Sequence, residues 1–134
     1  MKLVITAIIV NKKTKKFLIV KRSKDSDIHP GLWVFPGGIL EDFETIDQCL
    51  KREIKEETEL EIEDKKNYIS NYIYNRPNGE STLGLCFLVF TDEDKIKLNK
   101  ELEDFKWITS KEFNNYKHIP ELDIEIVKAY KIIK

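Results

Sequence analysis

The sequence has no long apolar run, few cysteines and almost no excess of charge of either sign. None of its apolar stretches is long enough to span a bilayer. Its two cysteines, Cys49 and Cys86, do not form the spaced framework of a disulfide-rich domain, so we expect free buried thiols and a cytoplasmic protein. The 23 basic and 24 acidic residues leave a net charge of −1, so neither nucleic acid nor a membrane is an expected partner.

The chain also lacks internal repeats, low-complexity tracts and Pro/Gly/Ser-rich linkers. Its 134 residues are enough for one core, and we predict a single domain over residues 1–134. The apolar run at residues 3–10 has no small-residue cleavage site and meets Asn11-Lys12-Lys13 too soon for a signal peptide. We interpret it as a first strand, which forms a hairpin-like pattern with residues 17–22.

Helical and strand patterns alternate over the rest of the chain. Thr45 and Gln48 have the Thr-x-x-Gln spacing of a capping box, which predicts a helix from about Thr45 to Leu60. Pro36-Gly37-Gly38 predicts a break before it. Further predicted elements are strands at 67–75, 82–91 and 104–109, a helical turn opening at Thr109, and a final helix with Pro120 in its first turn. Without a regular βαβ repeat, this order predicts an α/β fold, a mixed sheet flanked by helices.

Three carboxylates lie in unusual places on the first predicted helix. On a helical wheel, Glu53, Glu56 and Glu57 fall on or beside an apolar stripe that is expected to face the core. The stripe consists of Ile46, Cys49, Leu50 and Ile54. Glu53 and Glu57 are like charges at i,i+4, and burying such a cluster without compensation costs several kcal/mol or forces protonation. Arg52 can pair with one carboxylate only, so either the three form a solvated face or a hard divalent cation joins them.

The residues around this helix decide between these two interpretations. The segment begins with Pro36-Gly37-Gly38, continues through Glu41 and Glu44, and ends in Arg52-Glu53-Ile54-Lys55-Glu56-Glu57-Thr58-Glu59-Leu60. It resembles the signature of the Nudix hydrolase family: Gly, five residues, Glu, seven residues, then Arg-Glu-apolar-x-Glu-Glu-x-Gly-apolar. Glu59 stands where the family has Gly, and Phe43 stands where Gly is frequent. We therefore expect an altered turn at the end of the helix, without loss of a ligand.

The resemblance implies a fold, a reaction and a set of site residues. The fold is the Nudix α/β/α sandwich, and the reaction is hydrolysis of a diphosphate linkage in a nucleotide with Mg²⁺, or Mn²⁺, as cofactor. The implied metal ligands are Glu53, Glu56, Glu57, the Gly37 carbonyl and Glu101, with Glu103 as the second candidate for the last position. The implied catalytic residues are Glu53 as base, Arg52 as the group that orients a carboxylate, and Glu44 as the group that holds the loop. The implied substrate-binding residues are Arg22, Gly38 and Asp123.

Several of these assignments have an ordinary structural alternative. Glu101 is equally compatible with a solvated loop residue, and Arg22 with a surface arginine. His29 and His118 are interpreted as loop residues, and Trp33, Trp107 and Tyr74 as packing residues.

Three functions follow from the resemblance. The favoured one is a single-domain, MutT-like nucleoside triphosphate pyrophosphohydrolase, which can include oxidised or non-standard nucleotides among its substrates. The second is an ADP-ribose or other nucleotide-sugar pyrophosphatase, for which Pro77 is a weak indication. The third is a non-catalytic nucleotide-binding sensor. In each case the expected partner is a small nucleotide, and the protein is expected to be a monomer or a homodimer.

Overall fold

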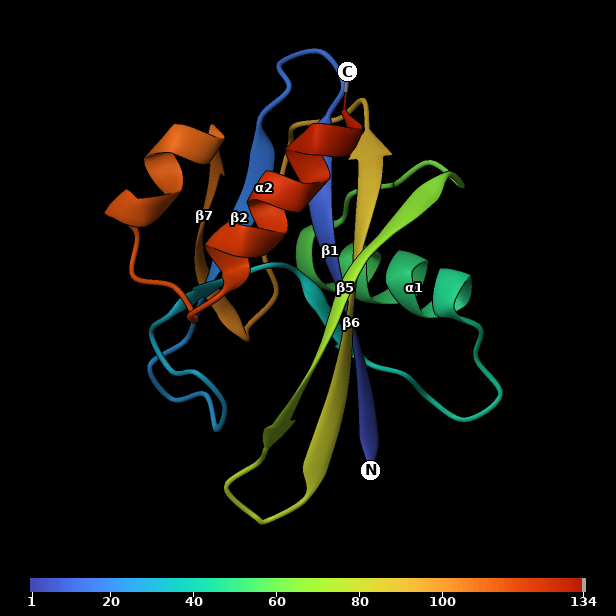
Figure 1. Ribbon diagram of the computed structural model, residues 1–134, viewed down its shortest axis with the longest axis vertical. Helices are drawn as coiled ribbons and strands as arrows, with labels where there is room; N and C mark the ends of the chain where they lie inside the picture. The colour runs from blue at the N-terminus through green and yellow to red at the C-terminus, as the bar shows by residue number, and fades with distance from the viewer. Residues whose placement is uncertain (134) are drawn as a thin grey trace.

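A computed structural model describes residues 1–133 of the chain. Seven strands, two α-helices and one 3₁₀ helix follow one another in this range (Figure 1). The strands are β1 (Lys2–Asn11), β2 (Phe17–Arg22), β3 (Trp33–Val34), β4 (Gly37–Ile39), β5 (Lys66–Asn75), β6 (Ser81–Thr91) and β7 (Leu102–Ile108). The helices are α1 (Ile46–Thr58), the 3₁₀ helix η1 (Ser110–Asn115) and α2 (Leu122–Ile132).

The strands form one mixed sheet, as predicted. Strand β1 is central and pairs in parallel with β6 along its whole length, whereas the other pairs are antiparallel. The hairpin partner of β1 is β2, which in turn pairs with β3 and β7. Strand β5 completes the other edge against β6.

Helices cover both faces of the sheet, and each face has its own apolar core (Figure 1). Alternate residues of β1 point to opposite faces, so Ile8 packs in the core under α2 and Ile9 in the core under α1. The α2-side core contains Ile126 of that helix, and the α1-side core contains Ile54. The result is the predicted α/β/α arrangement.

The structure corrects two details of the predicted elements. The Pro36-Gly37-Gly38 segment does break the chain direction, but Gly37 and Gly38 then enter strand β4, which pairs with β1. The last helix begins at Leu122, after Glu121 in the left-handed region at φ 79°, so Pro120 precedes the first turn rather than lying in it. Neither α1 nor α2, the α-helices of residues 1–133, has the length and apolarity that a membrane span requires.

The pairing of β1 opens a gap in the sheet. One edge of β1 is bonded to β2 near Val10, but to β4 over Val4–Thr6. Strands β2 and β4 therefore diverge from a common neighbour. The candidate site lies against this divergence, between the C-terminal half of α1, the loop after β2 and the start of α2.

Candidate active site

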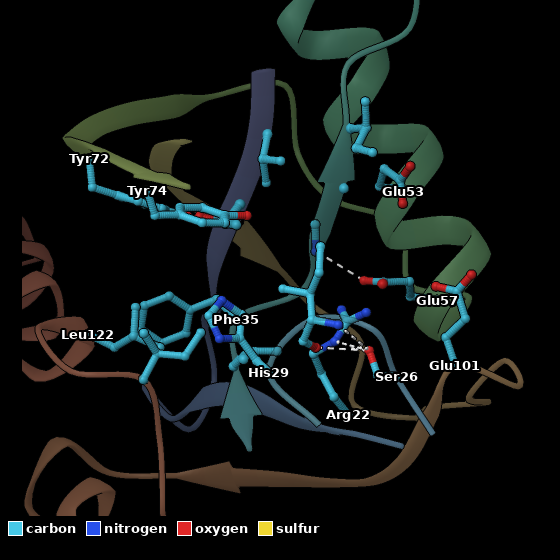
Figure 2. Close-up of a pocket in the computed structure, with 18 of the residues that line it drawn as sticks. Arg22, Ser26, His29, Phe35, Glu53, Glu57, Tyr72, Tyr74, Glu101 and Leu122 are labelled. Carbon is cyan, nitrogen blue, oxygen red and sulfur yellow. Dashed lines mark hydrogen bonds between the residues drawn. The ribbon is translucent and has the colours of Figure 1, made fainter. Parts of the chain in front are cut away.

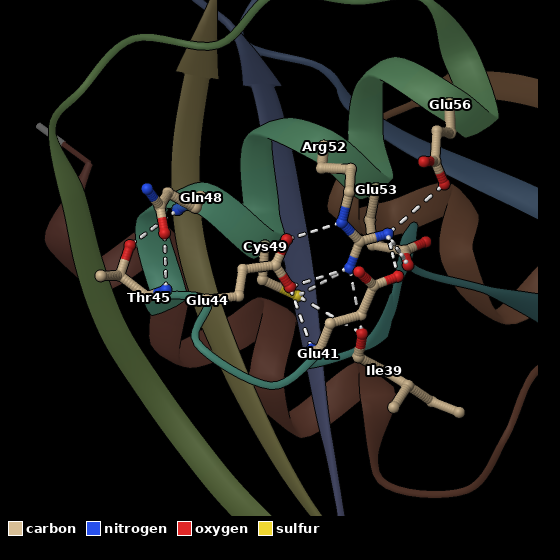
Figure 3. Close-up of polar contacts among 9 residues, drawn as sticks. All are labelled: Ile39, Glu41, Glu44, Thr45, Gln48, Cys49, Arg52, Glu53 and Glu56. Carbon is tan, nitrogen blue, oxygen red and sulfur yellow. Dashed lines mark hydrogen bonds and ion pairs between the residues drawn. The ribbon is translucent and has the colours of Figure 1, made fainter.

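Helix α1 places its carboxylates at the gap because its start is fixed. The Thr45 hydroxyl accepts a hydrogen bond from the Gln48 backbone N–H at 3.1 Å, and the Gln48 side chain accepts one from the Thr45 N–H at 2.9 Å (Figure 3). This is the predicted capping box. Leu50 and Ile54 then fill the core, which turns the Glu57 side chain inward on the same face of the helix.

Glu57 is the most deeply buried carboxylate of the site. The residue is 3% exposed, and its Oε1 accepts a hydrogen bond from the Gly37 N–H at 3.0 Å. The pKa of Glu57 is raised to about 8, chiefly by burial; the Gly37 hydrogen bond opposes this rise and the charge of Glu53 adds to it. A buried carboxylate with one hydrogen bond from the protein is well suited to receive a cation.

Glu53 lies one turn earlier and is held in place by Arg52. The guanidinium donates a hydrogen bond to Glu53 Oε1 at 2.7 Å. It also donates to both carboxylate oxygens of Glu44, at 2.6 and 2.9 Å (Figure 3). The hydrogen bond from Arg52 is the main reason that the pKa of Glu44 is lowered to about 2. Glu44 also accepts a hydrogen bond from the Glu41 N–H, so a chain of hydrogen bonds runs from the loop through Glu44 and Arg52 to Glu53.

Gly38 is required at its position by close packing. A Cβ built at Gly38 would lie 2.2 Å from the carboxylate carbon of Glu53. Burial is also the main cause of a raised pKa at Glu53, although the Arg52 hydrogen bond opposes the rise. The backbone of β4 and the carboxylate of α1 therefore meet without an intervening side chain.

Glu56 differs from its two neighbours. Its side chain is 56% exposed and points toward the Arg52 guanidinium, with Nη1 to Oε2 at 3.5 Å (Figure 3). The sequence pattern placed all three glutamates on or beside the buried stripe, but Glu56 lies on its solvent side. An exposed side chain of this kind can rotate toward the site without repacking the core.

The two departures from the family signature both adopt left-handed backbone. Glu59 has φ 64° and follows the last residue of α1, and Phe43 has φ 64° with a fully exposed side chain. Each non-glycine residue in this region costs about 1 kcal/mol. The turn after α1 therefore has the conformation that a glycine would adopt, at a cost in stability.

The carboxylates line a cavity of about 1120 Å³. Glu53, Glu56, Glu57 and Glu101 all line it, and Arg22 lies near Glu57 in the close-up view (Figure 2). The charge of Glu101 contributes to the raised pKa of both Glu53 and Glu57. Ser26 accepts a hydrogen bond from Arg22 Nε at 2.9 Å.

Glu103, the second candidate beside Glu101, does not line this cavity. It lies within β7 and forms an ion pair with Lys21 at 3.4 Å. Asp123 is likewise absent from the cavity lining, whereas its neighbours Leu122 and Ile124 belong to it. The contact with substrate suggested for Asp123 therefore has no support in this arrangement of α2.

The other end of the cavity is aromatic. Tyr72 and Tyr74 of β5 stack with ring centroids 5.9 Å apart, and His29 lies 5.8 Å from Tyr74 (Figure 2). Tyr74 and His29 were interpreted from the sequence as a packing residue and a loop residue, and both line the cavity. Tyr72 was missed, because in sequence β5 reads only as an alternating strand.

The remaining aromatic candidates pack within the fold. Trp33 is buried and packs against Tyr116 in a T-shaped arrangement, with ring centroids 5.1 Å apart. Trp107 donates a hydrogen bond from Nε1 to the Asp94 carbonyl at 3.1 Å. The ring of His118 stacks on Phe113 at 4.1 Å.

A family model described as the NUDIX domain matches residues 1–130. The chain belongs to the Nudix family. Among its relatives are proteins named nucleoside triphosphatase NudI. The one from Klebsiella pneumoniae (strain 342) is 27% identical over 111 residues, which cover 75% of this chain and 77% of the relative. The one from Enterobacter sp. (strain 638) is 28% identical over 107 residues, 73% of this chain and 76% of the relative.

Solved Nudix structures share the fold across nearly the whole chain. The MutT protein from Methanosarcina mazei Go1 has a TM-score of 0.79 at 20% identity, covering 97% of this chain and 93% of the other. The Nudix domain of Shewanella oneidensis NrtR, solved with ADP ribose, has a TM-score of 0.80 at 18% identity, covering 98% and 88%. Together with the family match, the nucleoside triphosphatase relatives indicate that this Nudix protein is a hydrolase acting on pyrophosphate bonds.

Nudix hydrolases generally use divalent metal ions, and the donors of this site are compatible with one. Among residues 1–133, no three carboxylate, imidazole or thiolate groups converge closely enough to form a ready-made metal centre. Glu56 lines the cavity with Glu53 and Glu57, but its side chain is turned toward Arg52. Carboxylate oxygens are the ligands that Mg²⁺ prefers, and the hydrogen bond that the buried Glu57 carboxylate accepts comes from the uncharged Gly37 N–H.

Proposed function

We propose that this Nudix hydrolase is a Mg²⁺-dependent nucleoside triphosphate pyrophosphohydrolase of the MutT-like kind. The observation that carries the proposal is the buried Glu57 carboxylate, bonded by the Gly37 N–H and lining one cavity with Glu53 and Glu101. The nucleoside triphosphatases among the relatives favour a triphosphate as substrate.

Each residue of the site has a role in this reaction. Glu57, Glu53, Glu56 and Glu101 would hold the metal, with the Gly37 carbonyl as a further candidate. When bound, Mg²⁺ would act as a Lewis acid that offsets the charge developing during displacement at phosphorus. Glu53 accepts a proton from the attacking water as general base, and Arg52 keeps its carboxylate oriented through the 2.7 Å contact. Glu44 holds Arg52 in turn.

Arg22 and Gly38 would contact the phosphate chain. Arg22 lies between the carboxylates and the aromatic side chains in the cavity, where a guanidinium can bind phosphate oxygens in bidentate fashion (Figure 2). Gly38 has no Cβ, so its backbone lies directly against the Glu53 carboxylate, beside which the phosphate chain would bind.

A nucleotide sugar is the second candidate substrate. The NrtR Nudix domain, which has this fold, was solved with ADP ribose. The cavity of about 1120 Å³ is large enough in principle for such a ligand. The triphosphate is preferred because the relatives with the stated activity are triphosphatases.

A substrate panel tests this order. We expect release of pyrophosphate and a nucleoside monophosphate from at least one nucleoside triphosphate, with a higher kcat/KM than for ADP-ribose. We also expect that a chelator abolishes turnover and that added Mg²⁺ restores it. Faster cleavage of ADP-ribose than of every triphosphate would reverse the order of the two substrates, and turnover that is unaffected by the chelator would contradict the metal assignment.

A further inference from the structure

The arginines of the cavity differ in how their charge is balanced. Arg52 forms ion pairs with several glutamates, whereas Arg22 forms no ion pair with any group of residues 1–133. Arg22 nevertheless lines the same cavity as Glu57. Burial raises the pKa of Glu57, and the charge of Arg22 is among the effects that oppose this rise. A guanidinium and a carboxylate that sense each other in a cavity attract, so the separation of Arg22 from the carboxylates needs a physical cause.

A serine hydroxyl holds the Arg22 guanidinium from the side. Arg22 Nε donates a hydrogen bond to Ser26 Oγ at 2.9 Å (Figure 2). The Ser26 hydroxyl donates its own hydrogen to the Ile28 carbonyl at 2.8 Å. A hydroxyl has a single hydrogen to donate, so Ser26 can only accept from Arg22. The bond between the two side chains therefore has one fixed direction.

The loop that carries Ser26, between β2 and β3, is anchored by its backbone. The Ser26 N–H donates to the Ser23 carbonyl at 3.1 Å, and the Gly31 N–H donates to the Arg22 carbonyl at 3.1 Å, so the loop folds back on the end of β2. The Ser23 N–H donates to the Glu101 carbonyl at 3.1 Å. These bonds tie the hydroxyl that holds Arg22 to the segment that brings Glu101 to the cavity.

The partner of Arg22 Nε is uncharged although carboxylates are close in sequence. Ser26 stands between Asp25 and Asp27, which also line the cavity, but within residues 1–133 neither forms an ion pair with Arg22. A carboxylate at Nε would neutralise the guanidinium, whereas a hydroxyl leaves its full positive charge. With Nε occupied, the two terminal nitrogens remain for a ligand, and this edge can bind two oxygens of one phosphate.

We propose that Ser26 is a positioning residue whose hydroxyl directs the terminal nitrogens of Arg22 toward the phosphate chain and keeps the guanidinium from closing onto the cation-site carboxylates. This inference rests on the proposed function, and it adds a residue whose effect on cation binding can be measured without substrate. Ser26 acts through Arg22 and does not touch the reacting phosphorus.

Loss of the hydroxyl would release the guanidinium. In Ser26→Ala, Arg22 Nε has no acceptor at this position, and its flexible side chain is free to pair with Glu57 or Glu101. Such a pair would compete with Mg²⁺ for the same oxygens and would turn the guanidinium away from the phosphates. Apparent affinity falls in proportion to the fraction of molecules whose binding groups stay free. One substitution should therefore weaken the binding of both cation and nucleotide.

Mg²⁺ binding in the absence of nucleotide is the first test. By calorimetry we expect the Kd for Mg²⁺ to rise by about three- to tenfold in Ser26→Ala. In Arg22→Ala no guanidinium is left to close on the carboxylates, so adding Ser26→Ala to that variant should leave the Kd unchanged. Ser26→Thr retains a hydroxyl and should retain the wild-type Kd. The control Thr14→Ala removes a hydroxyl from an exposed turn outside the cavity and should also retain it.

Kinetics with a nucleoside triphosphate are the second test. In Ser26→Ala we expect KM to rise by about tenfold, with a smaller change in kcat, because a hydrogen bond to a charged group is lost. Ser26→Thr and Thr14→Ala should remain close to the wild-type protein in both constants.

Three outcomes would overturn the inference. A loss of Mg²⁺ affinity that Ser26→Ala causes equally in the Arg22→Ala background would indicate a general structural role of the loop. A wild-type Kd and KM in Ser26→Ala, or a Ser26→Thr variant as impaired as Ser26→Ala, would remove the hydroxyl from the site. If Ser26→Ala does not fold, Ser26→Cys provides the same comparison, because a thiol is a much weaker acceptor. If the wild-type protein binds Mg²⁺ but cleaves no triphosphate, the proposed function fails, while the Mg²⁺ measurements still decide the role of Ser26.

Discussion

Replacing Glu57 by glutamine is expected to lower kcat by about a hundred- to ten-thousandfold, and replacing Glu53 by glutamine by a similar factor. Both side chains keep their volume in the variants, and the amide oxygen at position 57 can still accept the hydrogen bond from Gly37. What is lost is negative charge inside the cavity, which the proposed reaction needs to hold a cation and to take a proton from water. Steady-state turnover of the best triphosphate measures the effect.

Glu61→Gln is a suitable control for these two variants. Glu61 is an exposed residue that pairs with Lys55 at 3.3 Å, outside the cavity. Its replacement should leave kcat unchanged. If Glu53→Gln or Glu57→Gln also turned over at the wild-type rate while remaining folded, the site would not be catalytic and a nucleotide-binding sensor would be the better interpretation.

The metal-free protein is expected to lose stability as the pH rises from 5 to 8. The pKa of Glu57 is about 8 in the folded chain, against 4.5 for an unperturbed Glu. Because the folded value is the higher one, the folded state binds the proton more tightly. The contribution of Glu57 to stability is complete below pH 4.5 and is lost as the pH rises through about 8. Over this range the loss amounts to about 4 kcal/mol at most.

Urea unfolding in the presence of a chelator measures this dependence. In Glu57→Gln the position no longer titrates, so the fall between pH 5 and pH 8 should be much smaller. Glu44 does not contribute to the fall in stability between pH 5 and pH 8. Its pKa is lowered to about 2, so the stability that it provides is lost only in more acidic solution. An equally steep fall in both proteins would assign the dependence to another group.

Local signals predicted the part of the site that α1 carries. The Thr45 and Gln48 spacing located the start of the helix, and the periodicity of Leu50 and Ile54 correctly turned Glu57 inward. Such features depend on contacts within one or two turns, so a sequence contains them directly. The same periodicity could not tell Glu56 from Glu53, because the difference comes from the packing of α1 against β4 and from where Arg52 points.

The aromatic end of the cavity depends on contacts that are distant in sequence. Ser70 and Glu125 are separated by 55 residues and meet only because α2 packs across β5. Tyr72 reaches the cavity over Gly84 on the neighbouring strand. A single sequence carries no register between such elements, so it did not indicate that Tyr72 and Glu125 line the cavity.

Thermal unfolding during a Mg²⁺ titration at pH 8 tests most directly whether the inward-facing carboxylates of α1 form a cation site. For the wild-type protein we predict that Tm rises with the Mg²⁺ concentration, by an amount that corresponds to about 2.7 kcal/mol at a hundredfold excess over Kd. For Glu57→Gln we predict little or no rise. A wild-type Tm that does not respond to Mg²⁺ or Mn²⁺, or an equal rise in Glu57→Gln, would contradict the assignment.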